Sequence, residues 1–327
     1  AAVLNQVVEA EGLGLSAVWI AERFDTKELG VLCGAMAART SHIRMGFGSM
    51  AAGTRNAVLA AATATTFQSL FGDRLMMGLA RGLGAVLLNQ GMSVPTMAAY
   101  EDYTDILHRL FAGEVVDYDG PAGRYPHARL VDLPAAPRPM LWNSSWVPGP
   151  KALALTARKF DGLFLGTELT VEATRSIVNR AKDECRKIGR DPDTLFVANW
   201  SMIAPDLSPE EEMLLINARM VTHLSFPGIG ERLVEENGWD RREMEHALGR
   251  NEIQKDGVIA DQAYTRDQLV EAGAALPPEW IETGAIVGSA KACAQRIREY
   301  VDAGVDHVVL HAAGPAQIAP VLSYWES

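Results

Sequence analysis

The chain of 327 residues is 48% hydrophobic and 22% charged, which is typical of a soluble globular protein. Its net charge of -11 leaves no surplus of positive charge to release counterions from nucleic acid or to bind an anionic membrane, so the sequence argues against both partners. No apolar run reaches the length of a membrane-spanning helix.

Strand and helix patterns alternate along the first third of the chain. The predicted helices cover residues 2–12, 28–40, 57–71 and 96–111. The predicted strands cover residues 17–22, 43–50 and 75–82. A polar segment that contains proline and glycine, residues 115–137, follows without a predicted element.

The same alternation continues to the end of the chain. A strand over residues 139–145 leads into a helix that opens at Gly149-Pro150-Lys151. Further strands are predicted over residues 161–166, 195–204 and 306–311. Helices are predicted over residues 170–188 and 289–303, with Thr170 and Ser289 as caps, and a last helix opens at Gly314-Pro315.

This alternation predicts a parallel sheet with right-handed crossovers. Seven strands and about eight helical segments, beginning with a helix, fit a single-domain (β/α)8 TIM barrel over residues 1–327 whose first strand lies upstream of Ala1. An open doubly wound sheet is the alternative, but no Gly-x-Gly-x-x-Gly follows the first strand.

Residues 205–285 interrupt the alternation of strands and helices. They are predicted to form a helical insertion between the strand over residues 195–204 and the helix over residues 289–303. Ser208-Pro209 with three following acids is a well-formed helix start. Further helices are predicted over residues 231–237, 241–248 and 262–271. Such an insertion can serve as a lid or a dimer surface, and a helical subdomain without a role in the site is an equal alternative.

The three cysteines, Cys33, Cys185 and Cys293, lie far apart without paired spacing. They indicate neither a disulfide framework nor a zinc site, and we expect a protein of the reducing cytoplasm. The chain begins at Ala1 rather than at methionine, so the removal of an N-terminal signal peptide is left as an open alternative.

The predicted carboxyl ends of the strands, where barrel active sites lie, carry few catalytic side chains. His311 is the one histidine among them. The histidines His42, His108, His127, His223 and His246 fall on predicted helices or loops, where a solvated or hydrogen-bonded role is more common than catalysis. No histidines and carboxylates cluster with ligand spacing, so no metal site is expected. Hydrolase and lyase chemistry is disfavoured for the same lack of nucleophile and base.

The strand ends offer small residues, amides and hydroxyls instead, among them Asn143, Ser144, Gly166 and Thr167. Such a site suits a large bound cofactor. Two helix starts compete as its anion seat, Gly149-Pro150-Lys151 and Gly314-Pro315, because the first N–H groups of a helix are unpaired and its dipole favours negative charge. At Gly149 a simple strand-to-helix turn is the plainer interpretation.

Several stretches resemble the bacterial luciferase-like superfamily in its own order along nearly the whole chain. They are Leu13-Gly-Leu-Ser-Ala-Val-Trp-Ile-Ala-Glu-Arg-Phe-Asp25, Ala37-Ala-Arg-Thr40 with Ile43-Arg-Met-Gly46, Gly72-Asp-Arg-Leu-Met-Met-Gly-Leu-Ala-Arg-Gly82, Gly149-Pro-Lys-Ala-Leu-Ala-Leu155, Asp161-Gly162, Gly189-Arg-Asp-Pro192 and Tyr300-Val-Asp-Ala-Gly-Val-Asp-His-Val-Val-Leu310. The strongest resemblance is to the branch of probable deazaflavin-dependent oxidoreductases. Asp119-Gly-Pro-Ala-Gly-Arg-Tyr-Pro126 and Leu276-Pro-Pro-Glu-Trp280 look characteristic of that branch.

The resemblance implies a barrel, often a homodimer, that holds coenzyme F420 or FMN. It implies a bulge or a non-prolyl cis peptide under the cofactor ring, at a place that Gly48, Ser49 and Met50 occupy here. It also places the cofactor phosphate near Arg81 and Gly82 and on Gly149, Pro150 and Lys151, which favours this seat over the one at Gly314.

Two positions depart from the family pattern. Related sugar-phosphate dehydrogenases carry a basic His where this chain has Arg23, and an acidic Glu where it has Leu83, so their acid–base chemistry is not expected here. Arg23 and Asp25 could instead orient a polar substrate group, as could Arg55 and Arg81, for which an ion pair at the barrel rim is the alternative.

The sequence therefore favours an F420-dependent oxidoreductase that passes hydride between the deazaflavin and a small organic molecule. An FMN-dependent luciferase-like monooxygenase is the second hypothesis. A cofactor-binding protein without turnover is the third.

Overall fold

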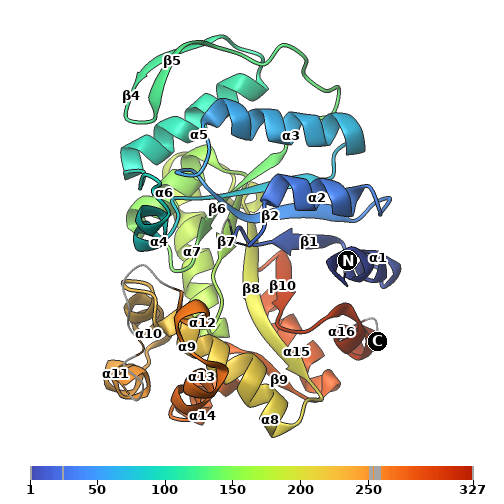
Figure 1. Cartoon of the computed structure of the whole chain (residues 1–327), viewed down its shortest axis with the longest axis vertical. Coiled ribbons are helices and arrows are strands. Elements are labelled where there is room, and N and C mark those ends of the chain that lie inside the picture. The colour runs from blue at the N-terminus through green and yellow to red at the C-terminus, as the bar shows by residue number, and fades with distance from the viewer. Residues whose placement is uncertain (1, 24–25, 250–252, 254–258, 326–327) are drawn as a thin grey trace. The chain divides into compact units, whose positions relative to one another are not determined.

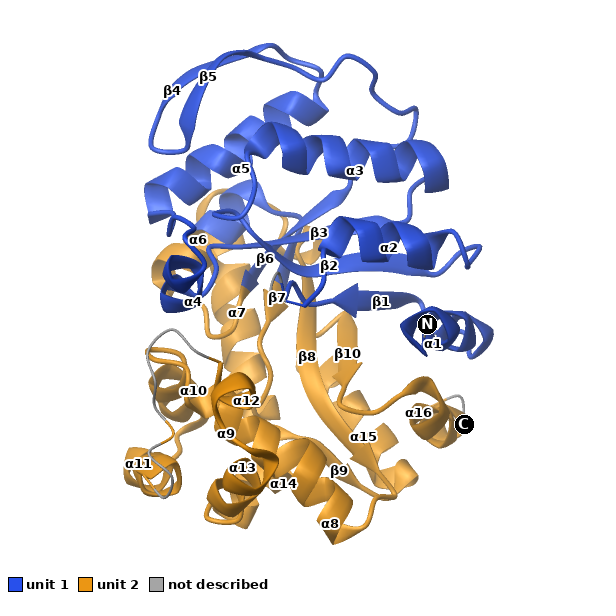
Figure 2. Ribbon diagram, viewed as in Figure 1, with its two compact units in different colours: residues 1–144, 155–163 blue, residues 145–154, 164–327 orange. Residues whose placement is uncertain are grey.

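The computed structural model describes residues 2–23, 26–249, 253 and 259–325 (Figure 1). The chain divides into two compact units (Figure 2). Unit 1 comprises residues 1–144 and 155–163, and unit 2 comprises residues 145–154 and 164–327. None of the helices in these described stretches has the length and apolar character that crossing a bilayer requires.

The elements of the first half follow the predicted order. They are α1 Ala2–Gly12, β1 Ala17–Ile20, α2 Leu29–Ala37, β2 Arg44–Ala51, α3 Ala57–Phe71, β3 Leu75–Ala80, α4 Gly84–Asn89, α5 Met97–Phe111, β4 Val116–Gly120, β5 Gly123–Ala128 and β6 Met140–Ser145. Helix α4 and the strands β4 and β5 were not predicted.

The elements of the second half add several that the sequence pattern did not indicate. They are α6 Pro150–Lys159, β7 Gly162–Leu165, α7 Val171–Lys187, η1 Pro192–Thr194, β8 Phe196–Pro205, α8 Pro209–Glu212, the π-helical η2 Met213–Asn217, α9 Ala218–Leu224, α10 Gly230–Asn237, α11 Arg241–Gly249, α12 Ala260–Ala263, α13 Arg266–Gly273, α14 Pro278–Gly284, β9 Ile286–Gly288, α15 Ala290–Asp302, β10 His307–His311 and α16 Pro315–Trp325. The predicted caps Thr170, Ser208 and Ser289 are confirmed, since each side chain accepts a backbone N–H of the first turn.

Unit 1 is built on a parallel sheet in which β2 lies between β1 and β3, and β3 also pairs with β6. Its tryptophans fit the sheet because two glycines leave room for them. A Cβ atom on Gly46 would lie 2.3 Å from the Trp19 ring, and one on Gly162 would lie 2.3 Å from the Trp142 ring. The two indole rings meet edge to face, with centroids 5.5 Å apart.

The segment 115–137, for which no element was predicted, forms an antiparallel hairpin of β4 and β5. Tyr118 and Tyr125 stand opposite each other with ring centroids 6.1 Å apart, and Tyr125 is buried. The hairpin therefore contributes to the core of unit 1, although most of its residues are polar.

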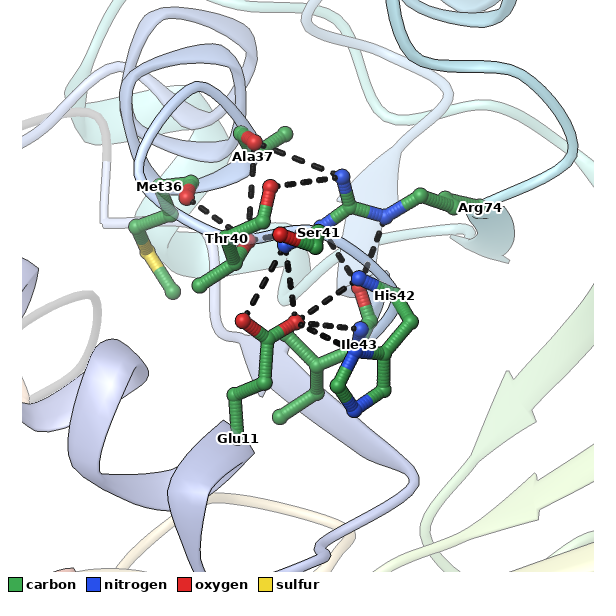
Figure 3. Close-up of polar contacts among 8 residues, drawn as sticks. All are labelled: Glu11, Met36, Ala37, Thr40, Ser41, His42, Ile43 and Arg74. Carbon is green, nitrogen blue, oxygen red and sulfur yellow. Dashed lines mark hydrogen bonds and ion pairs between the residues drawn. The ribbon is translucent and has the colours of Figure 1, made fainter.

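A carboxylate and a guanidinium hold the connection between α2 and β2 (Figure 3). Glu11 accepts the backbone N–H groups of Ser41, His42 and Ile43 at 2.7–3.1 Å. Arg74 donates to the Thr40 hydroxyl at 2.6 Å and to backbone carbonyl groups of the same connection, including that of Ile43 at 2.9 Å. These contacts provide hydrogen-bond partners for the backbone N–H and carbonyl groups of the turn that precedes β2.

Unit 2 contains the parallel pairs β8–β10 and β8–β9. The predicted insertion, residues 205–285, is helical where it is described, with α8 to α14 and η2. The helix predicted over 262–271 is wrong in one respect, because Thr265 starts a new helix with a capping box to Gln268 and so separates α12 from α13. Within unit 2, α9 packs against α13.

Candidate functional site

The predicted cofactor-binding residues divide between the two units, and each group is described by itself. In unit 1, the peptide bond between Gly48 and Ser49 is cis, and the pairing of β2 with β3 shifts register between Phe47 and Met50. The irregularity implied by the resemblance is therefore confirmed. Gly48 and Met50 are buried and Ser49 is half-buried. That these residues support a cofactor ring stays a prediction.

The arginines of unit 1 that were candidates for substrate orientation are mostly committed to the protein. Arg55 bridges the carboxylates of Glu22 and Glu28, so the alternative of an ion pair holds for this residue. Arg81 is exposed and its Nε donates to the carbonyl oxygen of Pro95 at 3.0 Å. The backbone of Arg23 pairs with that of Lys27 in an isolated antiparallel bridge, and the predicted role of the Arg23 side chain stays a prediction. Asp25 lies outside the described residues.

Asn143 is buried and hydrogen-bonded inside unit 1. Its Nδ2 donates to the Thr156 hydroxyl at 2.7 Å, and its Oδ1 accepts from the Tyr100 hydroxyl at 3.0 Å. The amide therefore ties β6 to its neighbours, and its predicted part in cofactor binding is untested. Ser144 is half-buried. Gly82, also half-buried, has a positive φ of 86°.

In unit 2, α6 begins as predicted, with Pro150 as its first residue. The carbonyl oxygen of Gly149 accepts the N–H of Leu153 at 3.1 Å, and Lys151 is exposed. A Cβ atom on Gly149 would lie 3.7 Å from Nη2 of Arg232, which comes from α10. In the described part of the chain, neither Lys151 nor Arg232 has a carboxylate partner within 4.0 Å. Two unneutralised cations thus lie at or beside a helix start.

Gly166 and Thr167 are the other predicted residues of unit 2, and both are buried. Gly166 lies beside Trp146, and Thr167 follows it in the sequence. The N–H of Gly166 donates to the carbonyl oxygen of Trp146 at 3.1 Å. A Cβ atom on Gly166 would lie 2.6 Å from the indole, so glycine is needed to seat Trp146 here.

Trp146 belongs to an aromatic group that also includes Trp200, His223, Phe226 and His311. The ring centroid of Trp146 lies 5.0 Å from that of His223 and 5.5 Å from that of Phe226. The rings of Trp200 and His311 have centroids 4.8 Å apart. Phe226 and His223 are buried, whereas Trp146, Trp200 and His311 are half-buried, so the group forms a mostly apolar surface that limits the access of water to its polar atoms.

A carboxyl group lies against this aromatic group. The Oε1 atom of Glu168 is 2.6 Å from Nδ1 of His223, and both side chains are buried. Burial raises the pKa of Glu168 well above its usual value, although Thr167 and Arg219 act in the opposite direction. Burial also lowers the pKa of His223 to about 3. Desolvation therefore favours the uncharged form of both groups.

His311, at the end of β10, is the second histidine of the group. Burial, and then Arg219 and His223, lower its pKa to about 3. Its ring centroid lies 6.5 Å from that of His223. Neutral imidazoles of this kind can donate and accept protons.

Unit 2 thus brings together a carboxyl group and two imidazoles that the sequence analysis did not single out as a group. Glu168 follows the predicted site residue Thr167 directly, so its position after a strand was a usable signal. His223 gave none, because it comes from the insertion, 55 residues further along the chain.

The chain matches the family model described as luciferase-like monooxygenase over residues 1–307. It is 24% identical over 307 residues to a 5,10-methylenetetrahydromethanopterin reductase of Methanolobus tindarius, which covers 92% of this chain and 86% of that protein. It is 25% identical over 298 residues to an F420-dependent glucose-6-phosphate dehydrogenase of Segniliparus rotundus, covering 87% and 77%.

Among solved structures, the chain is similar to the coenzyme F420-dependent tetrahydromethanopterin reductase of Methanopyrus kandleri. The TM-score is 0.80 at 18% identity, and the match covers 99% of this chain and 94% of that one. The likeness confirms the predicted fold class, a luciferase-like α/β fold of the TIM-barrel type. The names of the relatives agree with the prediction of an oxidoreductase.

Proposed function

Since this chain belongs to the luciferase-like monooxygenase family, we propose that it is an F420-dependent oxidoreductase that transfers hydride between the deazaflavin and a small organic substrate. Relatives named as F420-dependent support the choice of cofactor. The observation that carries the proposal is the start of α6, where Lys151 and Arg232 stand at or beside Gly149 without carboxylate partners in the described chain.

The donor set at this helix start fits the anionic tail of such a cofactor. The first N–H groups of a helix and its dipole favour a phosphate, and a guanidinium can bind one through two parallel hydrogen bonds. Gly149 leaves space at the turn, since among the described residues other than its two chain neighbours only the Arg232 side chain lies within 4 Å of where its Cβ would be. We therefore assign the phosphate to Gly149, Pro150, Lys151 and Arg232.

When bound, the deazaflavin supplies two-electron hydride chemistry. The chain's own part is to hold the tail, to keep the reacting carbon near the substrate and to exclude water. The rings of Trp146, Trp200 and Phe226 in unit 2 provide apolar surface for that exclusion.

Gly149→Asp tests the phosphate seat. An aspartate can cap α6 and pair with Arg232, so the fold is expected to persist. The new carboxylate repels the cofactor phosphate and competes for its cation, so we expect the Kd for F420 to rise about 100-fold or more. Fluorescence titration with purified F420 measures this change.

Gly149→Asn is the matched control, because asparagine caps a helix without adding charge. It should retain most of the affinity. Equal affinity of the aspartate variant and the unchanged protein for F420 would move the phosphate seat elsewhere.

An FMN-dependent monooxygenase is the second candidate, favoured by the description of the family model. The same titration with FMN separates the two, since tight FMN binding without F420 binding supports the monooxygenase. Cofactor binding without turnover over a broad substrate panel would support a binding protein.

A further inference from the structure

Unit 2 holds one carboxyl group and two imidazoles that the proposed cofactor anchor does not use. Glu168 lies just after β7, His223 lies on α9, and His311 ends β10. They come from three segments far apart in the chain, and the fold gathers them around Trp200 and Trp146.

The Glu168–His223 contact is the shortest polar contact of this group, with 2.6 Å between Oε1 and Nδ1. In the uncharged pair, the Glu168 carboxyl O–H donates to Nδ1, which leaves the ring proton of His223 on Nε2. A proton can then leave Nε2 while the Glu168 proton moves to Nδ1, and the imidazole stays neutral throughout.

His311 presents a buried nitrogen that calls for a partner. Its Nε2 atom is buried and has no hydrogen-bond partner among the described residues. A buried polar atom without a partner destabilises a fold, so its retention points to a ligand atom or a water. The 6.5 Å between the centroids of His223 and His311 can be spanned by one oxygen atom that makes two hydrogen bonds of about 2.8 Å.

The backbone at these residues is held in an uncommon conformation. Glu168 has a φ of 61°, and Ala312, next to His311, has a φ of 80°. Residues other than glycine adopt such angles rarely, and their clustering is characteristic of functional sites. Asn237 donates to the carbonyl oxygen of Glu168 at 2.7 Å, and the Tyr300 hydroxyl donates to that of Leu169 at 2.6 Å.

We propose that Glu168, His223 and His311 form the acid–base centre of this chain, a proton relay that serves the interconversion of a carbonyl compound and its alcohol. The inference rests on the proposed function, because the coenzyme provides the hydride. It also names the substrate class, since a relay of this kind is needed where the substrate oxygen gains or loses a proton.

The step balances in both directions. In reduction, the hydride from the reduced coenzyme adds to the carbonyl carbon with both electrons, the C=O π bond breaks, and the oxygen takes the Nε2 proton of His223. The carboxyl proton of Glu168 moves to Nδ1, and the carboxylate left behind regains a proton from water. Oxidation of the alcohol is the reverse. His311 contacts the same oxygen and positions it.

The charged groups that face the relay set its pH dependence. Apart from the larger effect of burial, the charge of Arg219 lowers the pKa of Glu168, His223 and His311, and the charge of Asp261 raises the pKa of His223. Reduction requires the protonated Glu168 carboxyl, so the rate should fall as the pH rises through the raised pKa of that group. Glu168→Gln keeps a hydrogen-bonding side chain but has no proton to transfer, so it should lose this limb of the pH profile.

The first experiment needs no cofactor. Proton NMR of the full chain should show a strongly downfield resonance from the proton shared in the short Glu168–His223 hydrogen bond, and Glu168→Gln and His223→Asn should each abolish it. His246→Asn, on the exposed face of α11, is the matched control and should leave the resonance unchanged. Absence of the resonance from the unchanged protein would overturn the relay whatever cofactor is bound.

The second experiment follows oxidation of reduced F420 by acetone and a panel of small ketones and aldehydes. We expect kcat to fall about 100-fold or more in Glu168→Gln, His223→Asn and His311→Asn. The Kd for F420, measured separately by fluorescence, should stay within about twofold, since the phosphate anchor is intact.

These measurements separate the two proposals. If the unchanged protein does not bind F420, the proposed function is refuted. The NMR resonance of the Glu168–His223 hydrogen bond would still report on the relay. A protein that binds F420 but reduces no carbonyl compound, or a His311→Asn variant with unchanged kcat, would refute the relay alone.

Discussion

Glu11 shows how one side chain can hold a turn that the sequence pattern does not explain. Desolvation raises its pKa, but the backbone N–H groups of His42, Ile43 and Ser41 and the nearby His42 ring outweigh this, and the pKa falls to about 2. The carboxylate is therefore favoured in the folded state. Its contribution to stability is present above the unfolded pKa and is lost as the pH falls from about 4.5 towards 2.

We therefore expect Glu11→Gln to lower the free energy of unfolding by about 1 to 2 kcal/mol at pH 7, because the backbone N–H groups lose a charged acceptor. The deficit should shrink as the pH falls from about 4.5 towards 2, because Glu11 is protonated first in the unfolded chain and then in the folded protein. Urea unfolding at both pH values measures it, with Glu9→Gln on the same helix as control. A deficit that is the same at every pH would contradict the ionic role.

At this scale the sequence was a partial guide. Thr40 and Arg74 lie in stretches that resemble the family, and both hold the turn before β2. Glu11 lies about 30 residues away from its partners in an ordinary helix, so no local pattern connects them. His223 was missed for the same reason, because a contact between distant segments leaves no periodic signal.

At the scale of elements, Asn237 links the end of α10 to the connection between β7 and α7. Its Nδ2 donates to the carbonyl oxygen of Glu168 at 2.7 Å, and its Oδ1 accepts the N–H of Thr170 at 3.0 Å. Thr170 in turn caps α7 through the N–H of Ala173. One residue of the insertion thus fixes the segment that carries Glu168.

Asn237→Ala should therefore lower the free energy of unfolding by about 1 to 3 kcal/mol, since two buried backbone groups lose their partner. Asn237→Asp keeps the acceptor for Thr170 but loses the donor to Glu168, so it should differ from alanine. Equal loss in both variants would mean that the donor alone matters, and no loss in either would remove the proposed link. Chemical denaturation measures each case.

Elements with strong local signals could be predicted closely. Helix α3 has the predicted bounds, and the caps at Thr170 and Ser289 start α7 and α15 as expected. The hairpin of β4 and β5 was missed because its strands are mostly polar, and their pairing depends on Tyr118 and Tyr125 meeting across the strands. Helices α9 and α14 were missed in the insertion, where the regular alternation ends.

At the scale of the whole molecule, the alternation of strands and helices was sufficient for the fold class, because parallel strands require crossover helices. The site was not predictable to the same degree. The small residues at the ends of β2 and β6 and the start of α6 could be predicted from local pattern. The arginines show that local pattern does not reveal which cations are free to bind a ligand. Arg55 is neutralised by Glu22 and Glu28, whereas Arg232, which was not singled out, stands beside Gly149.

Ligand-linked stability tests the assignment of the cofactor on the intact chain. A ligand that binds only the folded state stabilises it by about 2.7 kcal/mol when present at 100 times its Kd. We therefore expect F420 to raise the Tm of the unchanged protein and FMN to raise it less. Gly149→Asp should melt close to the unchanged protein without ligand, because the new side chain lies beside Arg232 in open space, and its Tm should respond little to F420. Differential scanning calorimetry measures both values. A lower Tm of the unliganded variant would mean that the substitution damages the fold. An unchanged Tm with a full response to F420 would show that the phosphate is bound away from α6.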